Sequence, residues 1–582
     1  MKKQQKQGYI NFKHLKRLLT SQKYFVWNPT ILNINEETDS EEFSFWQLDI
    51  DEIDNLSYAE VIKNGYGKVN QFFIDSIKEK ANKFNKNIFI NKEIKVEIAF
   101  QKTLEAINNV EIDWIINPVF IFDNCIIKPI LYRKDQMTLS SLIHSSKTKL
   151  KNYIQAYFEI NVFQKLEKQF NLKLKSYSLF NYDSKSNYLK APDLKFEESF
   201  FCWTQKNGPA KEIKTSIEDH NDQLDILTKV NSGIISESKS KGPQVFFQHE
   251  FDWYIKEIVL AKETKTISSL SEQDLTQWGE NPNFKELFPF EKLNLPAVSG
   301  SLIKKVDLLK LLDEEISLND LKANKKTLSL VCKQEDKINF VEVKRLIEQI
   351  KNQNCIWYDF EGFSMPFVIL ANTKPYQQLV FQVSVIQTRN DEIINTNNLV
   401  IDPKTIGVND FKKIVDAIYD PEAAKYVVYN QSYENTRLKE MKEIFLYQLN
   451  DEERLIYNQK IDHIIDNTFD LLELFKITNA NDKIPPIFLH KLLGFSSIKK
   501  LEDLITKSGI KLPVMIKPYK SLEVQNGLMA MNKAIQRYLD AIGDIEWNDV
   551  SEQLKAYCEN DVKAMIMVYQ FALFLLDKNN SY

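Results

Sequence analysis

The order of strand-like and helical segments in the C-terminal part of the chain constrains its fold most. Three apolar, strand-like runs follow one another with polar loop residues between them. A helical pattern, a short apolar run and a second helical pattern, which Ser432 is placed to cap, come next. The strand-like runs are 356–361, 379–388, 397–401 and 426–429, and the first helical pattern is 410–418. This order predicts an α/β domain built on a mixed sheet with flanking helices.

The length of 582 residues predicts more than one domain, because single hydrophobic cores stop growing beyond about 250–300 residues. We expect an N-terminal α/β domain at 1–203, where apolar runs are separated by the turn signal Asp123-Asn124. Residues 204–243 are polar and contain Gly and Pro, and helical patterns follow from 246 to about 330. We therefore expect a linker and helical connecting region at 204–350 and a C-terminal domain at 351–582.

Charge and cysteine content exclude several classes of protein. A net charge of −4 excludes a histone-like polycation but allows a nuclease with local basic patches. The five cysteines form no CxxC pair, so we expect no zinc site, no iron–sulfur cluster and no disulfide framework. The sequence has no apolar run of about 18 residues and no signal-peptide core, so we expect a cytoplasmic protein with no membrane partner.

Two acidic residues share one face of the first predicted strand. Asp359 and Glu361 are separated by one residue, and side chains on a strand alternate between faces, so both carboxylates project to the same side. Adjacent carboxylates repel each other unless a cation lies between them. An isolated pair of this kind is more often the exposed polar face of a strand, so the interpretation depends on other acids.

Further acids lie at intervals downstream. Tyr557 and Asp561 are four residues apart in a helical segment, where a phenol and a carboxylate can address the same point. Glu434 falls in the first turn of the helix after the strand at 426–429, and Asp470 begins another apolar helix. Taken singly, these residues have ordinary explanations as a core aromatic, a solvated charge, a helix N-terminal acid and a cap.

Taken together, the motifs resemble those of the DEDD exonucleases, which carry acids in this order on an RNase-H-like sheet. Tyr557 matches the DEDDy branch, because the sister branch has a His five residues before the last Asp, where this chain has Ala556. Five blocks resemble the bacterial domain of unknown function 2779 family, in its form from mollicutes, over about 356–576. The blocks are IWYDFEGF, KPYQQLVFQVSV, VVYNQSYENTRLKEM, FDLLELF and LKAYCENDVKAM.

This resemblance implies a metal-dependent exonuclease, acting 3′-to-5′ on the phosphodiester bonds of DNA or RNA, with a single strand or 3′ end as partner. Two divalent ions, Mg²⁺ or Mn²⁺, would be bound by four carboxylates, and Asp470 would support these ligands from behind. Tyr557 would orient the attacking water, because a phenol is rarely ionised at neutral pH. The four carboxylates are Asp359, Glu361, Glu434 and Asp561.

Several other residues are candidates for substrate binding. Those that could contact a terminal nucleotide are Tyr376, Gln377, Gln378 and Asn430. Lysines that could line a phosphate track are Lys491, Lys499, Lys500, Lys511 and Lys517, although solvated surface lysines are an equally good interpretation in a lysine-rich chain.

The N-terminal region resembles PD-(D/E)XK nucleases of the RecB type. The matching stretches are WIINPVF, IIKPILYRK, LSSLIHSSKTK and the helix that contains Gln155-Ala156-Tyr157. Pro129 stands where the metal-binding Asp is expected, and segment 142–147 lacks the acid of the acid-x-Lys pair. The resemblance therefore implies a degenerate nuclease domain that serves as a nucleic-acid platform or a structural partner.

Two alternatives stay open. The chain is either an active exonuclease or a catalytically inactive nucleic-acid-binding or scaffold protein, in which Glu434, present where many DEDD enzymes carry Asp, is an early sign of decay. The extra methylene of Glu shifts the carboxylate by about an ångström, which matters at a metal site. A protein–protein adaptor with a coincidental acidic cluster is a third, weaker interpretation.

Overall fold

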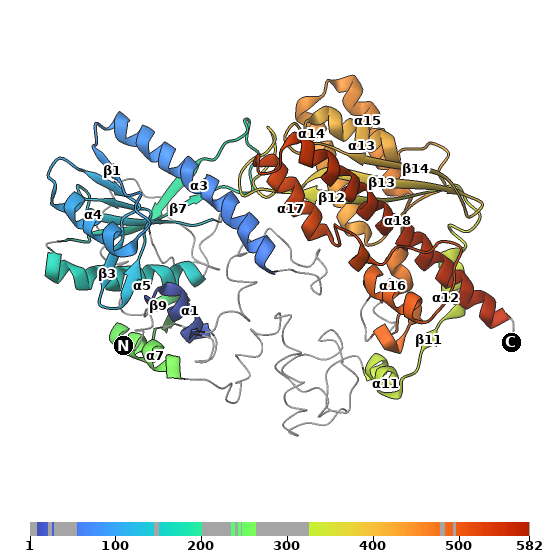
Figure 1. Cartoon of the computed structure of the whole chain (residues 1–582), viewed down its shortest axis with the longest axis horizontal. Helices are drawn as coiled ribbons and strands as arrows, with labels where there is room; N and C mark the ends of the chain where they lie inside the picture. The colour runs from blue at the N-terminus through green and yellow to red at the C-terminus, as the bar shows by residue number, and fades with distance from the viewer. Residues whose placement is uncertain are drawn as a thin grey trace. The chain divides into compact units, whose positions relative to one another are not determined.

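The computed structural model describes residues 8–20, 26–27, 55–144, 150–170, 172–200, 234–238, 242–245, 247–263, 325–477, 484–492 and 496–580. The chain divides into an N-terminal and a C-terminal unit, which are described separately (Figure 1). Both units are mixed α/β structures. In the part of the chain that the structure describes, no helix has the length and apolar character needed to cross a membrane.

The N-terminal unit is built on a six-stranded mixed sheet with the order β1-β2-β5-β6-β7-β8. Strands β2, β5 and β6 form an antiparallel meander, and helix α5 connects β6 to the parallel strand β7. The predicted turn at Asp123-Asn124 is confirmed, because it joins β3 to β4 in a hairpin. The strands are β1 (Ile88–Ile90), β2 (Trp114–Ile116), β3 (Phe120–Phe122), β4 (Cys125–Ile127), β5 (Leu131–Arg133), β6 (Thr138–Leu142), β7 (Ser176–Tyr182) and β8 (Phe196–Phe200).

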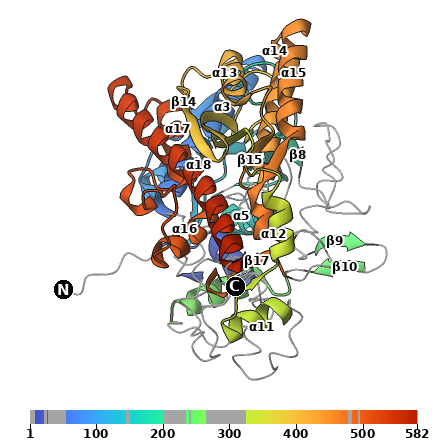
Figure 2. The ribbon, with the colours of Figure 1, turned by 90° about the vertical axis from the view of Figure 1, so that its right-hand side faces the viewer.

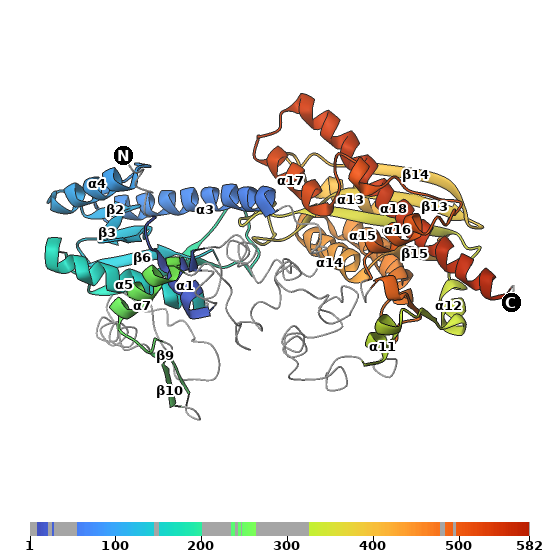
Figure 3. The same cartoon turned by 60° about the horizontal axis from the view of Figure 1, so that its bottom comes forward.

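Helices cover both faces of this sheet. Trp114 and Ile116 pack in one apolar cluster with Phe73 of helix α3, whereas Ile115 between them packs in the cluster that contains Phe158 of helix α5. This division follows from the alternation of side chains along β2. The helices of this unit are α1 (Phe12–Thr20), α3 (Asn55–Lys83, of which residues 62–83 fall in this unit), α4 (Val96–Asn108), α5 (Leu150–Phe170) and α7 (Phe251–Leu260). Figure 3 shows α3 and α5 on opposite sides of the strands.

The C-terminal unit is built on a five-stranded sheet with the order β14-β13-β12-β15-β16. Strands β12, β13 and β14 are antiparallel, and β15 and β16 extend the sheet in parallel with β12. The four predicted strands and their order are confirmed. The apolar helix predicted to begin at Asp470 is wrong, because residues 468–470 pair with β15 as a further strand and residues 471–474 form a short 3₁₀ turn. The strands are β12 (Cys355–Phe363), β13 (Leu379–Arg389), β14 (Glu392–Val400), β15 (Lys425–Val428) and β16 (Thr468–Asp470).

Two predicted boundaries in this unit are wrong. The third strand begins at Glu392, before the expected residue 397. The prediction started too late because the first half of the strand is exposed at the sheet edge and carries no alternating apolar pattern. The helix after β15 begins at Gln431, with Asn430 at its N-cap position in a left-handed conformation (φ 75°), so Ser432 lies inside the helix. Ser432 instead donates a hydrogen bond to Asn430 Oδ1 over 2.6 Å.

Long helices cover the two faces of the C-terminal sheet. Trp357 and Val427 pack with Val562 and Met565 of helix α18 in one large apolar cluster. Helices α14 and α15 lie on the opposite side of the strands (Figure 2). The helices of this unit are α11 (Lys325–Lys333), α12 (Phe340–Ile347), α13 (Val408–Ile418), α14 (Gln431–Gln448), α15 (Asp451–Asp466), α16 (Ile498–Lys507), α17 (Gly527–Tyr538) and α18 (Asp544–Asn580).

The region predicted as a linker and helical connection at 204–350 lies partly outside the described residues. Its described parts are a hairpin of β9 (Ile234–Ser238) and β10 (Gly242–Val245), helix α7, and helices α11 and α12. Helix α7 belongs to the N-terminal unit, whereas α11 and α12 belong to the C-terminal unit. Strand β11 (Lys337–Ile338) precedes α12 and pairs with β17 (Ile487–Phe488).

Candidate metal centre

Strand β12 presents the first two acids from the centre of the C-terminal sheet. Asp359 pairs with Ser384 of β13, and Glu361 follows on the same face two residues later. The pairing register shifts directly after Glu361, so the strand is irregular where its second acid projects. Glu361 is 8% exposed, and its carboxylate lies against Gly527 at the start of α17.

Helix α18 brings the third acid to the same place. Oxygen atoms of Asp359, Glu361 and Asp561 lie within 4.8 Å of one another. The sequence predicted that Asp359, Glu361 and Asp561 would meet, and the structure brings them together. Three carboxylates at this spacing offer the oxygen-only donor set that Mg²⁺ and Mn²⁺ prefer.

The fourth predicted acid, Glu434, lies beside this group without being one of its three members. Its side chain is 2% exposed in the first turn of α14. Within the described residues its Oε2 atom has no hydrogen-bond partner, which is costly for a buried carboxylate. Burial and the negative charge of Asp359 raise the pKa of Glu434 well above its ordinary value.

Burial dominates the electrostatics of the cluster, and repulsion between carboxylates adds to it at Asp359 and Glu434. Burial and the neighbouring charge of Asp561 raise the pKa of Asp359 well above its ordinary value. Burial also raises the pKa of Asp561, although Lys499 and hydrogen bonds from Tyr519 and Tyr557 oppose this shift. Buried carboxylates this close together must be neutralised by protons or by cations. The unpaired Oε2 atom of Glu434 and the repulsion between the carboxylates both fit a bound divalent cation.

Two tyrosines and one lysine surround Asp561. Tyr557, predicted from its spacing, lies on α18 one turn before Asp561, and Tyr519 donates its hydroxyl hydrogen bond to Asp561 Oδ1. The ammonium group of Lys499 lies 4.9 Å from the ring centre of Tyr519 and 5.6 Å from that of Tyr557. Burial raises the pKa of both phenols well above the ordinary value, so both are protonated at neutral pH.

Sequence reasoning missed Tyr519 and Cys558. Tyr519 lies in a short 3₁₀ turn (Tyr519–Ser521) after Pro518, and no motif marks it. The Cys558 thiol lies 3.7 Å from Asp359 Oδ2, and it follows Tyr557 directly in the recognised motif. Of the five candidate lysines, Lys499 is the one placed over the site tyrosines.

Asp470 supports the turn that carries Glu434. Its Oδ1 atom accepts hydrogen bonds from the backbone N–H groups of Asn430, at 2.8 Å, and Leu472, at 3.0 Å. Asp470 therefore caps the 3₁₀ turn Leu471–Leu474 and fixes the start of α14 at the same time. Asn430, predicted to bind substrate, is held in this turn through its own backbone.

The loop between β12 and β13 contains the other predicted substrate residues. Gln378 Oε1 accepts a hydrogen bond of 2.6 Å from Arg437 and faces Gly362, the residue after Glu361. Gln377 instead accepts from the backbone N–H of Lys374, and Tyr376 adopts a left-handed conformation (φ 62°). Gln378 is thus the member of this loop that lies next to the acid-bearing end of β12.

One protein-family model matches part of the C-terminal unit. Residues 356–497, which span β12 to β17 and include Asp359, Glu361 and Glu434, match the family described as "Domain of unknown function (DUF2779)". Asp561 and Tyr557 lie beyond the matched range. This finding supports the resemblance to that family.

Particular relatives come from mycoplasmas and a ureaplasma. "Uncharacterized protein MG366" of Mycoplasma genitalium is 27% identical, over 90% of this chain and 87% of its own length. "Uncharacterized protein UU173" of Ureaplasma parvum is 32% identical over 50% of this chain and 42% of its own length. "Uncharacterized protein MG366 homolog" of Mycoplasma pneumoniae is 34% identical over 39% of this chain and 33% of its own length. No solved structure matches the chain.

Proposed function

We propose that the C-terminal unit is a metal-dependent exonuclease of the DEDDy type that hydrolyses phosphodiester bonds of DNA or RNA from a 3′ end. The observation that carries the proposal is the meeting of Asp359, Glu361 and Asp561 within 4.8 Å, with the orphaned carboxylate of Glu434 beside Asp359. The strand order, with a three-stranded meander extended by two parallel strands, is the order expected of an RNase-H-like sheet and supports the proposal.

The residues present divide the chemical work among them. Asp359, Glu361, Glu434 and Asp561 would hold two divalent ions, whose chemistry is to activate a water and to neutralise charge on the scissile phosphate. Protonated Tyr557 is suited to orient that water, because it can donate and accept a hydrogen bond without ionising.

Two neighbours adjust the charge of the ligands. Tyr519 stabilises the ionised form of Asp561 through its hydrogen bond. The positive charge of Lys499 opposes the upward pKa shifts of Asp359 and Asp561. It therefore favours the ionised, metal-binding form of both carboxylates.

The proposal is tested by incubating single-stranded DNA or RNA, labelled at the 5′ or 3′ end, with the full chain and Mg²⁺, Mn²⁺ or EDTA. We expect stepwise shortening from the 3′ end with either metal and none with EDTA. Asp359→Asn and Asp561→Asn should each reduce the rate at least about 100-fold, because each removes a charged ligand. Asp549→Asn, an exposed acid on the same helix as Asp561, is the matched control and should retain the rate.

Each other outcome has a defined meaning. Cleavage that survives both substitutions would place the activity outside this cluster and overturn the proposal. Binding without cleavage in every metal would instead support an inactive nucleic-acid-binding protein. The observation behind that alternative is that Glu434 lies outside the close group of three acids. Glu434→Asp tests whether the longer side chain of Glu limits turnover.

A further inference from the structure

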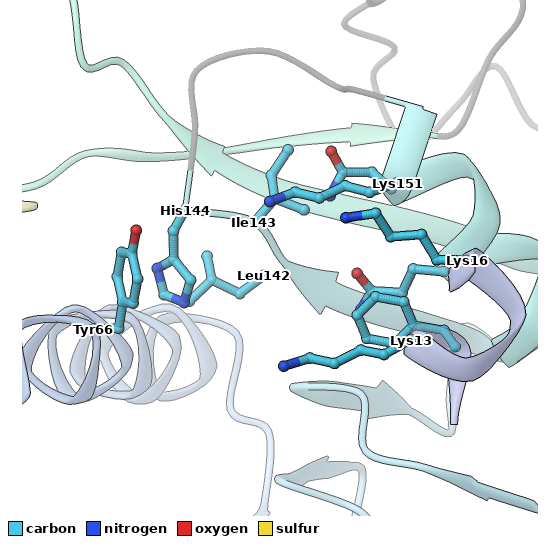
Figure 4. A pocket seen from close by; sticks show the side chains of 10 residues that line it. Lys13, Lys16, Tyr66, Leu142, Ile143, His144 and Lys151 are labelled. Carbon is cyan, nitrogen blue, oxygen red and sulfur yellow. The ribbon is translucent and has the colours of Figure 1, made fainter. Parts of the chain in front are cut away.

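A cavity lined by several polar side chains lies in the N-terminal unit, at the segment where the sequence lacks nuclease acids. It has a volume of about 230 Å³, is open to solvent on one side, and is lined by residues of helices α1, α3 and α5 and of the end of β6. The described residues that line it are Phe12, Lys13, Lys16, Tyr66, Leu142, Ile143, His144, Lys151, Asn152 and Gln155. Figure 4 shows the side chains of Lys13, Lys16 and Lys151 extending into the space that His144 and Tyr66 border on the other side.

The charge of this cavity is opposite to that of the metal centre. Three lysines line it, and the ten residues named above include no Asp or Glu. Lys13 and Lys16 lie three residues apart on one face of α1, and Lys151 comes from the start of α5, so two separate elements converge on the same space. Burial lowers the pKa of His144 to about 3, so this ring is neutral at pH 7 and the lysines supply the positive charge.

The polar wall of the cavity is held by a buried network. Gln155 donates a hydrogen bond of 2.8 Å to Glu159, which also accepts from Ser141 at 2.7 Å and from Tyr177 at 2.8 Å. The carboxylate of Glu159 is therefore bonded within the core, where it is 3% exposed. Because the amide nitrogen of Gln155 is engaged there, the orientation of this lining side chain is fixed before any ligand arrives.

We propose that this cavity binds a phosphate group of a nucleic-acid strand through Lys13, Lys16 and Lys151, without a metal ion. Ammonium groups recognise phosphate as point charges, and the described lining of this cavity offers no carboxylate to a divalent cation. The proposal does not depend on the exonuclease activity proposed for the C-terminal unit.

The size of the cavity limits what it can admit. Sites for drug-sized ligands usually have volumes of about 300–1,000 Å³, so a cavity of about 230 Å³ admits a phosphate with part of its sugar more readily than a whole nucleotide. Tyr66 stacks on His144, with ring centres 4.2 Å apart, and this pair closes the side opposite the lysines. These features favour a phosphate attached to a strand that continues outside the cavity.

The test measures binding of a fluorescein-labelled single-stranded oligonucleotide to the full chain by anisotropy. EDTA and the background substitution Asp359→Ala prevent cleavage, so failure of the exonuclease proposal leaves this test unaffected. Lys16→Gln and Lys151→Gln should each weaken binding about tenfold. Each should also reduce the slope of log affinity against log salt concentration by about 0.7, the value for one phosphate contact on a single strand. Lys16→Arg keeps the charge and should restore both values.

Control experiments test whether the cavity lysines bind the phosphate, and whether that phosphate belongs to a strand or to a free nucleotide. Lys83→Gln, an exposed lysine on α3 outside the cavity, should bind as the parent does. Inorganic phosphate should compete with the oligonucleotide in the parent and lose this effect in the two Gln variants. Wild-type affinity and salt slope in both Gln variants would overturn the proposal. Tight binding of adenosine 5′-monophosphate that the oligonucleotide cannot displace would assign the cavity to a free nucleotide and overturn the strand assignment.

Discussion

Tyr519 affects the charge of Asp561, a proposed metal ligand, without being a ligand itself. Its hydroxyl donates to Asp561, and this hydrogen bond favours the ionised carboxylate. A metal ion binds only the ionised form, so the hydrogen bond and the metal act in the same direction. Tyr519 is therefore a positioning residue whose effect reaches the reaction through Asp561.

Tyr519→Phe should raise the pKa of Asp561 further and weaken Mn²⁺ binding about tenfold, the loss expected for one hydrogen bond to a charged group. Titration of Mn²⁺ against the unfolding temperature measures this, and the exonuclease rate should fall in parallel. Tyr447→Phe, at an exposed tyrosine of α14, provides the comparison and should change neither quantity. An unchanged Mn²⁺ affinity in Tyr519→Phe would remove Tyr519 from the site.

Glu440 is a second residue whose charge state matters, and it lies outside the carboxylate cluster. Burial raises the pKa of Glu440 to about 7, although the positive charge of Arg437 opposes the shift. Its Oε2 atom lies 2.8 Å from Arg437 Nε, but the pair lacks hydrogen-bond geometry. Arg437 in turn donates a hydrogen bond to Gln378, which lies beside the acid-bearing strand β12. Glu440 therefore contacts the site indirectly, through Arg437 and Gln378.

The raised pKa of Glu440 predicts a stability that falls as pH rises. Between the unfolded pKa of about 4.3 and the folded pKa of about 7, the folded chain keeps a proton that the unfolded chain has released, so the free energy of unfolding decreases. Glu440→Gln should remove this loss and be more stable than wild type by about 1–3 kcal/mol at pH 8, with little difference at pH 5. Unfolding temperatures across this pH range test it, with exposed Glu452→Gln as control; a constant difference would contradict the prediction.

At the scale of elements, the site depends on how closely α17 approaches β12. A Cβ atom added at Gly527 would lie 3.2 Å from Glu361 Oε2, which is closer than ordinary van der Waals contact. Glycine at the first position of α17 thus makes room for the carboxylate. Glycines are scarce in this chain, 14 in 582 residues, so each one that permits a close approach is informative.

Gly527→Ala should displace Glu361 and weaken Mn²⁺ binding and exonuclease activity about tenfold, whereas the helix itself gains from the better helix former. The unfolding temperature without metal should therefore stay within about 2 °C of wild type. Gly543→Ala, where an added Cβ meets no atom within 4 Å, is the matched control. Equal metal binding by the two variants would show that Glu361 tolerates the added methyl group.

The sequence predicted those elements whose side chains are patterned by burial. Strands β12, β13 and β15 are almost wholly buried, so their apolar runs mark them, and the acids of β12 stand out against that pattern. The exposed first half of β14 carries no such pattern, so its start was predicted too late. Tyr519 and Gly527 lie near the site through tertiary packing of α16–α18, which leaves no periodic signal along the chain.

At the scale of the whole molecule, the two units carry sites of opposite charge. One is a group of carboxylates that repel one another, and the other is a cavity lined by lysines and no acid among its described residues. The carboxylate group is costly without a counter-ion and suits a divalent cation, whereas the ammonium groups of the second site suit a phosphate. Binding of a divalent cation and binding of a phosphate can therefore be measured as separate properties of the two units in the intact chain.

Mn²⁺ should raise the unfolding temperature of the full chain, because a ligand that binds the folded state alone stabilises it, by about 2.7 kcal/mol at 100 times its dissociation constant. The stabilisation should increase from pH 6 to pH 8, since protons compete with the cation for carboxylates whose pKa values are raised by burial and, at Asp359, also by the charge of Asp561. Asp359→Ala should abolish it and Lys16→Gln should leave it intact, as differential scanning calorimetry can measure. Mn²⁺ stabilisation that persists in Asp359→Ala would place the cation elsewhere and remove the physical basis of the proposed exonuclease site.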